Sequence, residues 1–143
     1  MSKRRVVITG LGLLSPVGNN VSESWNNIIQ GQSGVKLIDK FDVSNFETHF
    51  AATVDCAVQD FLDKKDVRRT DPFIQYGLIA SKECLEDSLI DLDNTDLTKF
   101  GVSIGSGIGG LGTIEENKIK LSEEGPRKIS PFFVPGAISN MVS

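Results

Sequence analysis

Two cysteines and one histidine are the side chains best suited to nucleophilic chemistry in this sequence of 143 residues. Cys56 follows Asp55, and Cys84 follows Glu83. Neighbouring carboxylates disfavour the negatively charged thiolate, which is the reactive form of cysteine. His49 is the single histidine, so a mechanism that needs two imidazoles cannot be assembled from these residues. We therefore predict that none of the three is catalytic.

Two glycine-rich loops could bind a dinucleotide. Residues 105–110 read Gly-Ser-Gly-Ile-Gly-Gly and follow a predicted strand, where backbone without a Cβ could approach a pyrophosphate. Residues 10–12 offer a second loop, with residues 35–39 as its next strand. The first loop lacks the acidic residue expected about 20 positions on, and the second lacks the third glycine. The alternative is that these glycines allow tight turns and close packing.

Two groups of basic residues stand out on an acidic chain. The first contains Lys64, Lys65, Arg68 and Arg69, and the second contains Arg127 and Lys128. Positions 65, 68 and 69 can share one helical face and would present a positive patch to an acidic protein or a phosphate. The alternative is an ordinary solvated face that Asp63 and Asp66 neutralise.

An alternation of strands and helices must position these residues. β-Branched and aromatic runs predict strands over residues 6–9, 50–54 and 100–105, with residues 32–48 irregular. Capping patterns predict helices from Asn20 to Gly31, over residues 72–89 and over residues 113–124, the second mostly buried. Asp60 is the predicted cap of a short helix that carries the first basic group. This order indicates the α/β fold class.

The composition excludes several classes of protein. There are 15 Lys and Arg against 19 Asp and Glu, a net charge of −4, which argues against nucleic-acid binding driven by net charge. Hydrophobic residues at 39% and charged residues at 24% exclude disordered and fibrous classes. Two cysteines without paired spacing predict neither a disulfide framework nor a zinc site, and favour the cytoplasm. The uncharged segment 129–143 suggests that the sequence stops inside a larger domain.

Four segments resemble one enzyme family. They read RVVITGLGLLSPVG at residues 5–18, DPFIQYG at 71–77, IGSGIGGLG at 104–112 and GPRKISPFFVP at 125–135. Together they are similar to β-ketoacyl-[acyl-carrier-protein] synthases, and the last two favour the type II synthase of bacterial fatty-acid elongation. The resemblance runs along the whole chain but covers only the first part of the family's length.

The resemblance implies a fold and a reaction. The family has the thiolase-like layered α/β/α/β/α fold and works as a homodimer. It catalyses a decarboxylative Claisen condensation between an acyl-cysteine thioester and a malonyl thioester carried by acyl carrier protein. The catalytic Cys and two His lie beyond the matched positions, so residues 1–143 are expected to be a partial N-terminal domain, inactive alone. No metal, nucleic acid or membrane is implied, and no cofactor beyond the carrier-borne phosphopantetheine.

The resemblance also assigns peripheral roles. Ile108 resembles the residue that lines the acyl-chain tunnel, and Phe133 and Val134 resemble residues that reach the tunnel of the partner subunit. Positions that dock the acidic carrier are matched by Lys65, Arg68, Arg69, Arg127 and Lys128. Two alternatives to a condensing enzyme stay open: a non-catalytic protein that binds the carrier, and an α/β module that binds NAD(P).

Overall fold

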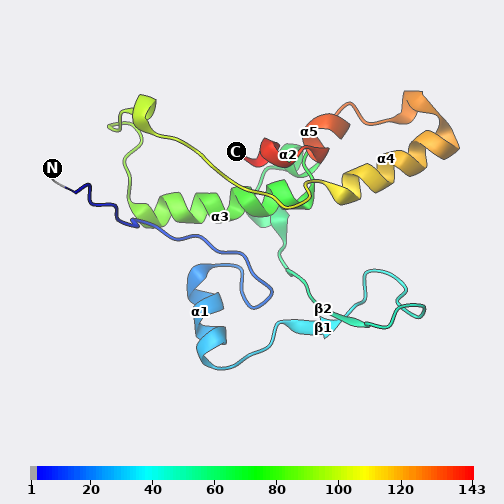
Figure 1. The fold of residues 1–143 in the computed structure, drawn as a ribbon, viewed down its shortest axis with the longest axis horizontal. Coiled ribbons are helices and arrows are strands. Elements are labelled where there is room, and N and C mark those ends of the chain that lie inside the picture. Colours follow the sequence, from blue (N-terminus) through cyan, green and yellow to red (C-terminus); the bar gives the residue numbers. More distant parts are fainter. Residues whose placement is uncertain (1–2) are drawn as a thin grey trace. The chain divides into compact units, whose positions relative to one another are not determined.

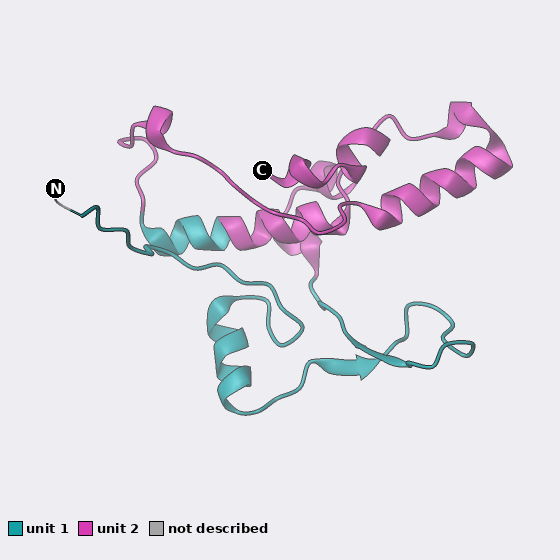
Figure 2. Ribbon diagram, viewed as in Figure 1, with its two compact units in different colours: residues 1–56, 82–89 teal, residues 57–81, 90–143 magenta. Residues whose placement is uncertain are grey.

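The computed structural model describes residues 3–143, which form two compact units (Figure 2). Unit 1 contains the residues up to 56 together with 82–89, and unit 2 contains residues 57–81 and 90–143. The described helices and strands are, in chain order, α1 (Val21–Ile29), β1 (Val35–Leu37), β2 (Phe50–Ala52), α2 (Lys64–Val67), α3 (Pro72–Ser88), α4 (Leu111–Glu124) and α5 (Phe133–Ala137) (Figure 1). Helix α3 contributes its first ten residues to unit 2 and the remainder to unit 1.

Helix α1 of unit 1 begins where the sequence predicts. The side chain of Asn20 accepts a hydrogen bond from the backbone N–H of Glu23 at 2.8 Å. The Glu23 carboxylate accepts one in return from the backbone N–H of Asn19 at 2.7 Å. These bonds satisfy donors that a helix start leaves unpaired. The helix ends before Gly31, whose φ of +69° is a conformation that glycine adopts readily.

The predicted strand over residues 6–9 is wrong. These residues have no regular secondary structure, and Val6 and Ile8 are 91% and 83% exposed. A strand needs a neighbouring strand to pair its backbone, and the described residues supply none here. The next residues instead bind α3, because Leu11 and Leu13 donate backbone N–H groups to the carboxylates of Asp87 and Glu83 at 2.8 Å each.

The described strands form one antiparallel pair, β1 with β2, in the register Val35–Ala52, Lys36–Ala51 and Leu37–Phe50. The predicted strand over residues 50–54 is confirmed in a shorter form, whereas the expectation that residues 32–48 are irregular is wrong at β1. An antiparallel pair needs no crossover helix between its strands. It is therefore not the parallel strand–helix–strand unit that a dinucleotide fold requires.

Unit 2 is built mainly from helices. Helix α3 begins at Pro72 and α4 ends at Gly125, which has a φ of +88°, so both predicted helices are confirmed within a few residues. The expectation that α3 is mostly buried is wrong, since its buried residues are Ile74, Gln75 and Ile79.

The predicted strand over residues 100–105 is also wrong. No strand is assigned there, and both backbone polar groups of Ile104 bond instead to the Ser143 hydroxyl, at 3.2 Å and 3.3 Å. As at residues 6–9, no neighbouring strand is available within residues 3–143 to pair with this segment.

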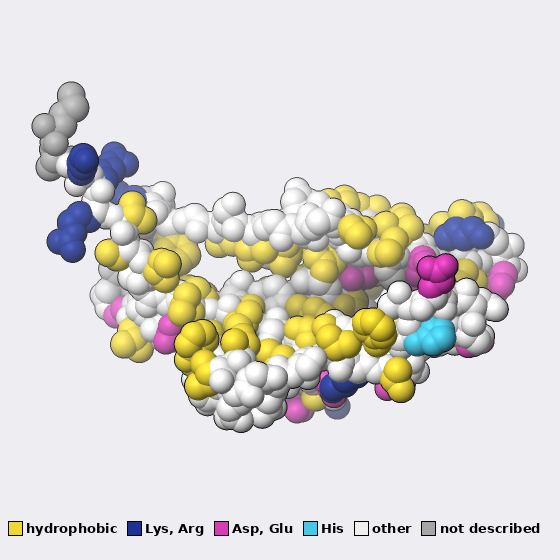
Figure 3. Space-filling view, turned by 60° about the horizontal axis from the view of Figure 1, so that its bottom comes forward, with side chains coloured by type: hydrophobic (Ala, Val, Ile, Leu, Met, Phe, Trp, Pro, Cys, Tyr) yellow, Lys and Arg dark blue, Asp and Glu magenta, His cyan; other side chains and the backbone are white. Residues whose placement is uncertain are grey.

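Few apolar side chains are buried. Among the described residues they are Ile74, Ile79 and Val142, and Figure 3 shows hydrophobic side chains over much of the visible surface. Asp71, Gln75 and Asn117 of unit 2 are buried and polar.

Within residues 3–143, no helix combines the length and hydropathy needed to cross a bilayer.

Candidate functional site

The first basic group lines a pocket of about 500 Å³ in unit 2. The lining residues, which we call the basic pocket, are Lys64, Lys65, Arg68, Arg69, Ser130, Pro131 and Phe132. The ion pairs found among residues 3–143 involve none of these four basic side chains. Four cations therefore line one hollow, and no acidic side chain lines it with them. Asp71 and Glu116 line a neighbouring pocket together with Arg68 and Arg69. The excess of positive charge in the basic pocket favours binding of an acidic ligand.

One wall of the basic pocket is α2 and the residues after it. The helix is preceded by Asp63 and not by Asp60, which lies in the earlier 3-10 turn Val58–Asp60, so the predicted cap is wrong. Three residues separate Asp60 from the helix start, whereas an N-cap residue is adjacent to it. Arg68 caps the C-terminus of α2, and Arg69 lies beyond it. The pocket thus brings together Lys65, Arg68 and Arg69, although they do not share one helix.

The opposite wall is the segment 130–132. The guanidinium carbon of Arg69 lies 4.9 Å from the centre of the Phe132 ring, a cation–π contact between the two walls. Phe132 and Pro131 are both exposed and add an apolar surface to the pocket. Cations beside an apolar surface suit an amphipathic acidic partner.

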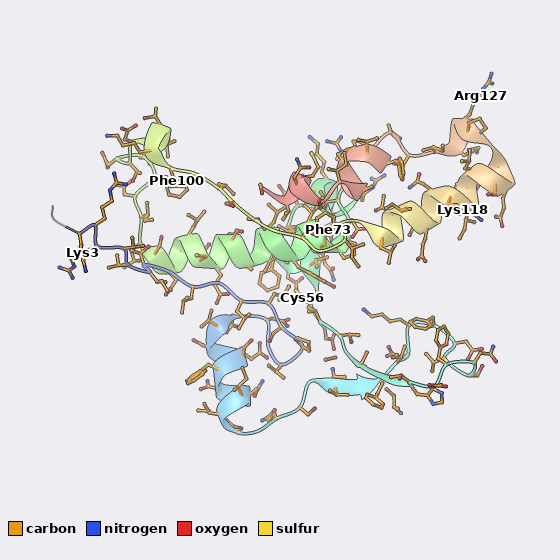
Figure 4. All side chains as sticks on the ribbon, in the orientation of Figure 1. Lys3, Cys56, Phe73, Phe100, Lys118 and Arg127 are labelled. Atoms are coloured by element: carbon orange, nitrogen blue, oxygen red, sulfur yellow. The ribbon has the colours of Figure 1, made fainter. Side chains whose placement is uncertain are left out.

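The second basic pair lies apart from the basic pocket. Arg127 and Lys128 occupy the 3-10 turn Pro126–Lys128, and Figure 4 shows Arg127 extending from the turn beyond α4. The Lys128 ammonium lies 3.8 Å from the Glu124 carboxylate, and both side chains are largely exposed. Such an exposed pair contributes little stability and leaves the lysine available. Of the five predicted docking residues, the pocket therefore gathers three.

Lys64 belongs to the basic group predicted from the sequence but not to the predicted docking residues, and the sequence predicts no role for Ser130 or Phe132. The structure adds all three to the pocket. The available signal was the segment GPRKISPFF, which joins the second basic pair to Phe132 within a few residues.

The predicted acyl-chain residues lie at exposed or half-buried positions of unit 2. Ile108 is 72% exposed, Val134 is exposed and Phe133, the first residue of α5, is half-buried. None of the three lines the basic pocket or the pocket beside it. Their role in an acyl tunnel stays a prediction.

The glycine-rich loops pack closely against neighbouring backbone. A Cβ on Gly10 would collide with the Cys84 carbonyl, and a Cβ on Gly110 would collide with the Gly136 carbonyl. Gly109 has a φ of +85°, which strains any other residue. Close packing thus accounts for Gly10, Gly109 and Gly110, whereas a Cβ on Gly105 or Gly107 would meet nothing within 4 Å. The antiparallel pair β1–β2 does not provide the parallel sheet of a dinucleotide fold.

The two thiols and the imidazole are not assembled into a catalytic group. The Cys84 thiol donates to the Gly10 carbonyl at 3.4 Å, and Cys56 is half-buried. The ring Nε2 of His49 lies 2.7 Å from the Phe46 carbonyl oxygen, at an exposed position. Across the described chain, no three His, Cys, Asp or Glu side chains are grouped as metal ligands.

Solved structures with the same fold are ketosynthases. "The ishigamide ketosynthase/chain length factor" superposes with a TM-score of 0.81 at 23% identity, covering 99% of this chain and 36% of that one. A beta-ketoacyl synthase from Burkholderia phymatum superposes at 0.77 and 22% identity, covering 98% and 35%. A third structure is a type II PKS acyl-carrier protein in complex with its ketosynthase. It superposes with a TM-score of 0.73 at 24% identity, covering 98% of this chain and 37% of that one. The fold is therefore the layered α/β fold of ketosynthases, matched over part of its length.

The sequence comparison gives the family. The family described as "Beta-ketoacyl synthase, N-terminal domain" matches residues 3–143, and the chain belongs to it. The 3-oxoacyl-[acyl-carrier-protein] synthase 2 of Vibrio harveyi is 52% identical over 146 residues, which cover 100% of this chain and 35% of that protein. The synthase 2 of Coxiella burnetii is 51% identical, and the match covers 100% of this chain and 35% of that protein. The synthase 2 of Staphylococcus aureus is 41% identical, and the match covers 98% of this chain and 34% of that protein. The chain thus spans about a third of the length of the curated relatives it matches.

Proposed function

We propose that this chain is the N-terminal part of a 3-oxoacyl-[acyl-carrier-protein] synthase that elongates fatty acids in the cytoplasm as a homodimer. The proposal is supported by the family match and by identities of 41–52% to synthases of that name. Residues 1–143 then form one partial domain that precedes the catalytic cysteine. We call the full polypeptide that includes them the intact protein.

The proposed reaction has two transfers. A cysteine thiolate attacks the acyl thioester of the carrier, so that the acyl-cysteine bond forms and the carrier sulfur leaves as a thiolate. Malonyl-carrier then loses CO2, and the carbanion formed attacks the acyl-cysteine carbonyl, so that a carbon–carbon bond forms and the thiolate leaves. We assign no step to Cys56, Cys84 or His49, because the family resemblance places the catalytic Cys and two His beyond residue 143. Ile108, Phe133 and Val134 would contact the acyl chain.

The observation that carries the proposal is the basic pocket. The cations Lys64, Lys65, Arg68 and Arg69 face it together with Phe132. An acidic acyl carrier protein could bind there by electrostatic steering followed by contact with the apolar surface. The solved complex of a type II PKS ketosynthase with its acyl-carrier protein supports a carrier as the partner for this fold. Arg127 and Lys128 would extend the docking surface beyond the pocket.

The test is the charge reversal Arg68→Glu in the intact protein. Calorimetry measures the dissociation constant for a holo acyl carrier protein. Removing a cation and adding an anion should weaken binding about tenfold or more, which corresponds to about 1.4 kcal/mol. In condensation assays, KM for malonyl-carrier should rise while kcat changes little.

The matched control is Lys118→Glu on α4, which makes the same change of charge at an exposed lysine outside both pockets. It should leave the dissociation constant within about twofold, because the Lys118 side chain lines neither the basic pocket nor the neighbouring pocket. Equal affinity of Arg68→Glu and the unaltered protein would refute docking at the basic pocket.

A further inference from the structure

A buried amide on α3 holds the α2 wall of the basic pocket. Gln75 is only 6% exposed, and its Nε2 donates to the backbone carbonyls of Val67 at 3.0 Å and Thr70 at 2.7 Å. These two carbonyls bracket Arg68 and Arg69. Helix α2 is a single turn, and Asp63 makes no side-chain capping bond to it, so it has little stability of its own. The Gln75 amide therefore fixes the backbone from which both guanidinium groups extend.

A second buried amide, on α4, holds the opposite wall. Asn117 is 5% exposed, and its Oδ1 accepts a hydrogen bond from the backbone N–H of Ser130 at 2.9 Å. Its Nδ2 donates to the Thr113 carbonyl at 2.8 Å, which fixes the orientation of the amide. The Ser130 hydroxyl in turn accepts from the backbone N–H of Phe132 at 3.1 Å. Asn117 thus anchors the segment that carries the aromatic ring.

Hydrogen bonds between α3 and α4 link the residues that carry the two amides. The backbone N–H of Gln75 donates to the Asp71 carbonyl at 3.2 Å. The buried Asp71 carboxylate accepts from Thr113, from its backbone N–H at 3.1 Å and its hydroxyl at 2.8 Å. Thr113 then accepts from Asn117. The two helices that hold the walls are therefore joined through Asp71 and Thr113.

Burying these polar groups is costly unless every one is paired. No buried side-chain nitrogen or oxygen in the described residues lacks a partner. An aliphatic side chain would fill the same volume without that requirement, but it would not select one position for each wall.

We propose that Gln75 and Asn117 are positioning residues of the basic pocket, which set the distance between the cations of one wall and Phe132 of the other. This inference rests on the proposed function, because its measurable effect is on carrier binding. The amides touch no partner themselves. They act through Arg68, Arg69 and Phe132.

The experiment combines Gln75→Met and Asn117→Leu with the double substitution Arg68→Ala/Arg69→Ala in the intact protein. Gln75→Met should weaken binding of holo acyl carrier protein about tenfold, the effect of misplacing a charged contact worth about 1.5 kcal/mol. Asn117→Leu, which acts through Phe132, should weaken binding by no more than the roughly twofold to fivefold expected for loss of the ring itself. In the protein without the two arginines, Gln75→Met should weaken binding less than about twofold, because coupled positions are not additive.

Two controls separate positioning from stability. Ser24→Ala removes a fully buried hydroxyl of unit 1 that bonds Ser15 and the Gly18 carbonyl, so it should lower the melting temperature without changing carrier affinity. If Gln75→Met does not fold, Gln75→Asn replaces it in the comparison with and without the two arginines. Gln75→Asn keeps an amide but places it on a shorter side chain. Circular dichroism decides which variants are folded.

The outcomes distinguish the two proposals. Carrier affinity that does not change on removing both arginines overturns the proposed docking function. Where the arginines matter, equal losses from Gln75→Met with and without them, or no loss at all, overturn the positioning role. A loss that disappears with the arginines supports it.

Discussion

The guanidinium carbon of Arg69 lies 4.9 Å from the centre of the Phe132 ring, although 62 residues separate the two along the chain. Both residues line the basic pocket, so the contact joins its two walls. It also holds a flexible cation in a defined place beside an apolar surface, which reduces the side-chain entropy lost when a partner binds.

Replacing Phe132 should therefore weaken carrier binding. Phe132→Ala removes the ring, its apolar surface and the contact that holds the Arg69 side chain in place, so the affinity should fall roughly twofold to fivefold, which corresponds to about 0.5–1 kcal/mol. Phe132→Leu keeps most of the apolar surface, so its affinity for the carrier should lie between that of the unaltered protein and that of Phe132→Ala. Calorimetry with holo acyl carrier protein measures both. Phe100→Ala, at another partly exposed phenylalanine of unit 2, is the control and should have no effect.

The Asp71 carboxylate should be a major source of stability in unit 2. It accepts hydrogen bonds from the backbone N–H of Phe73 at 3.4 Å and from two donors of Thr113, so it caps α3 and joins it to the start of α4. Asp71→Ala should destabilise the protein by about 1–3 kcal/mol, because buried donors lose their acceptor. Thr113→Val loses only the hydroxyl donor and should cost less, about 1 kcal/mol.

Urea unfolding of the intact protein measures both effects as a shift of the midpoint at constant slope. Thr98→Val removes an exposed hydroxyl bond to Asp96 of 2.6 Å and is the comparison, expected near zero. A midpoint for Asp71→Ala as high as that of Thr98→Val would contradict the assigned role.

The helices were predictable because their signals are local. Asn20 with Glu23, and Asp71 with Pro72, mark helix starts within four residues, and Gly31 and Gly125 mark ends. Strands depend on a partner. The runs at 6–9 and 100–105 have the residue types of strands, yet the described chain offers them no neighbour, whereas the three-residue β1 forms because β2 pairs with it.

In the candidate site, too, some features are visible in the local sequence and others arise only from contacts made in the fold. The spacing of Lys65, Arg68 and Arg69 indicated a positive patch, since charge is visible in the sequence. The roles of Gln75 and Asn117 were not visible, because a buried amide is defined by its partners, and the partner of Asn117 lies 13 residues away. Phe132 likewise acquires its place only when the segment after α4 folds back to Arg69.

The loop around Gly110 offers a test of packing against dinucleotide binding. Gly110→Ala would place a Cβ against the Gly136 carbonyl and should destabilise the protein by about 1–3 kcal/mol. Gly107→Ala is the matched control, since its Cβ would meet nothing within 4 Å, and it should be neutral or stabilising by up to about 1 kcal/mol. Thermal melting measures both. A saturable change in NAD(P)H fluorescence that Gly107→Ala abolishes would contradict the packing interpretation.

The loop after α3 should respond to acid. Asn94 holds the pKa of the Asp91 carboxyl below its usual value, first through its side-chain amide, at 2.6 Å, and then through its backbone N–H. Because the folded pKa is depressed, the stabilising contribution is present above the unfolded pKa and is lost as the pH falls through the folded pKa. Asn94→Ala should raise the pKa of Asp91 toward 3.8, as followed by NMR titration of its carboxyl carbon. Asp42, whose pKa is lowered by Ser44 in another loop, should be unaffected in the same titration. A pKa of Asp91 that does not move in Asn94→Ala would show that Asn94 does not hold the carboxylate.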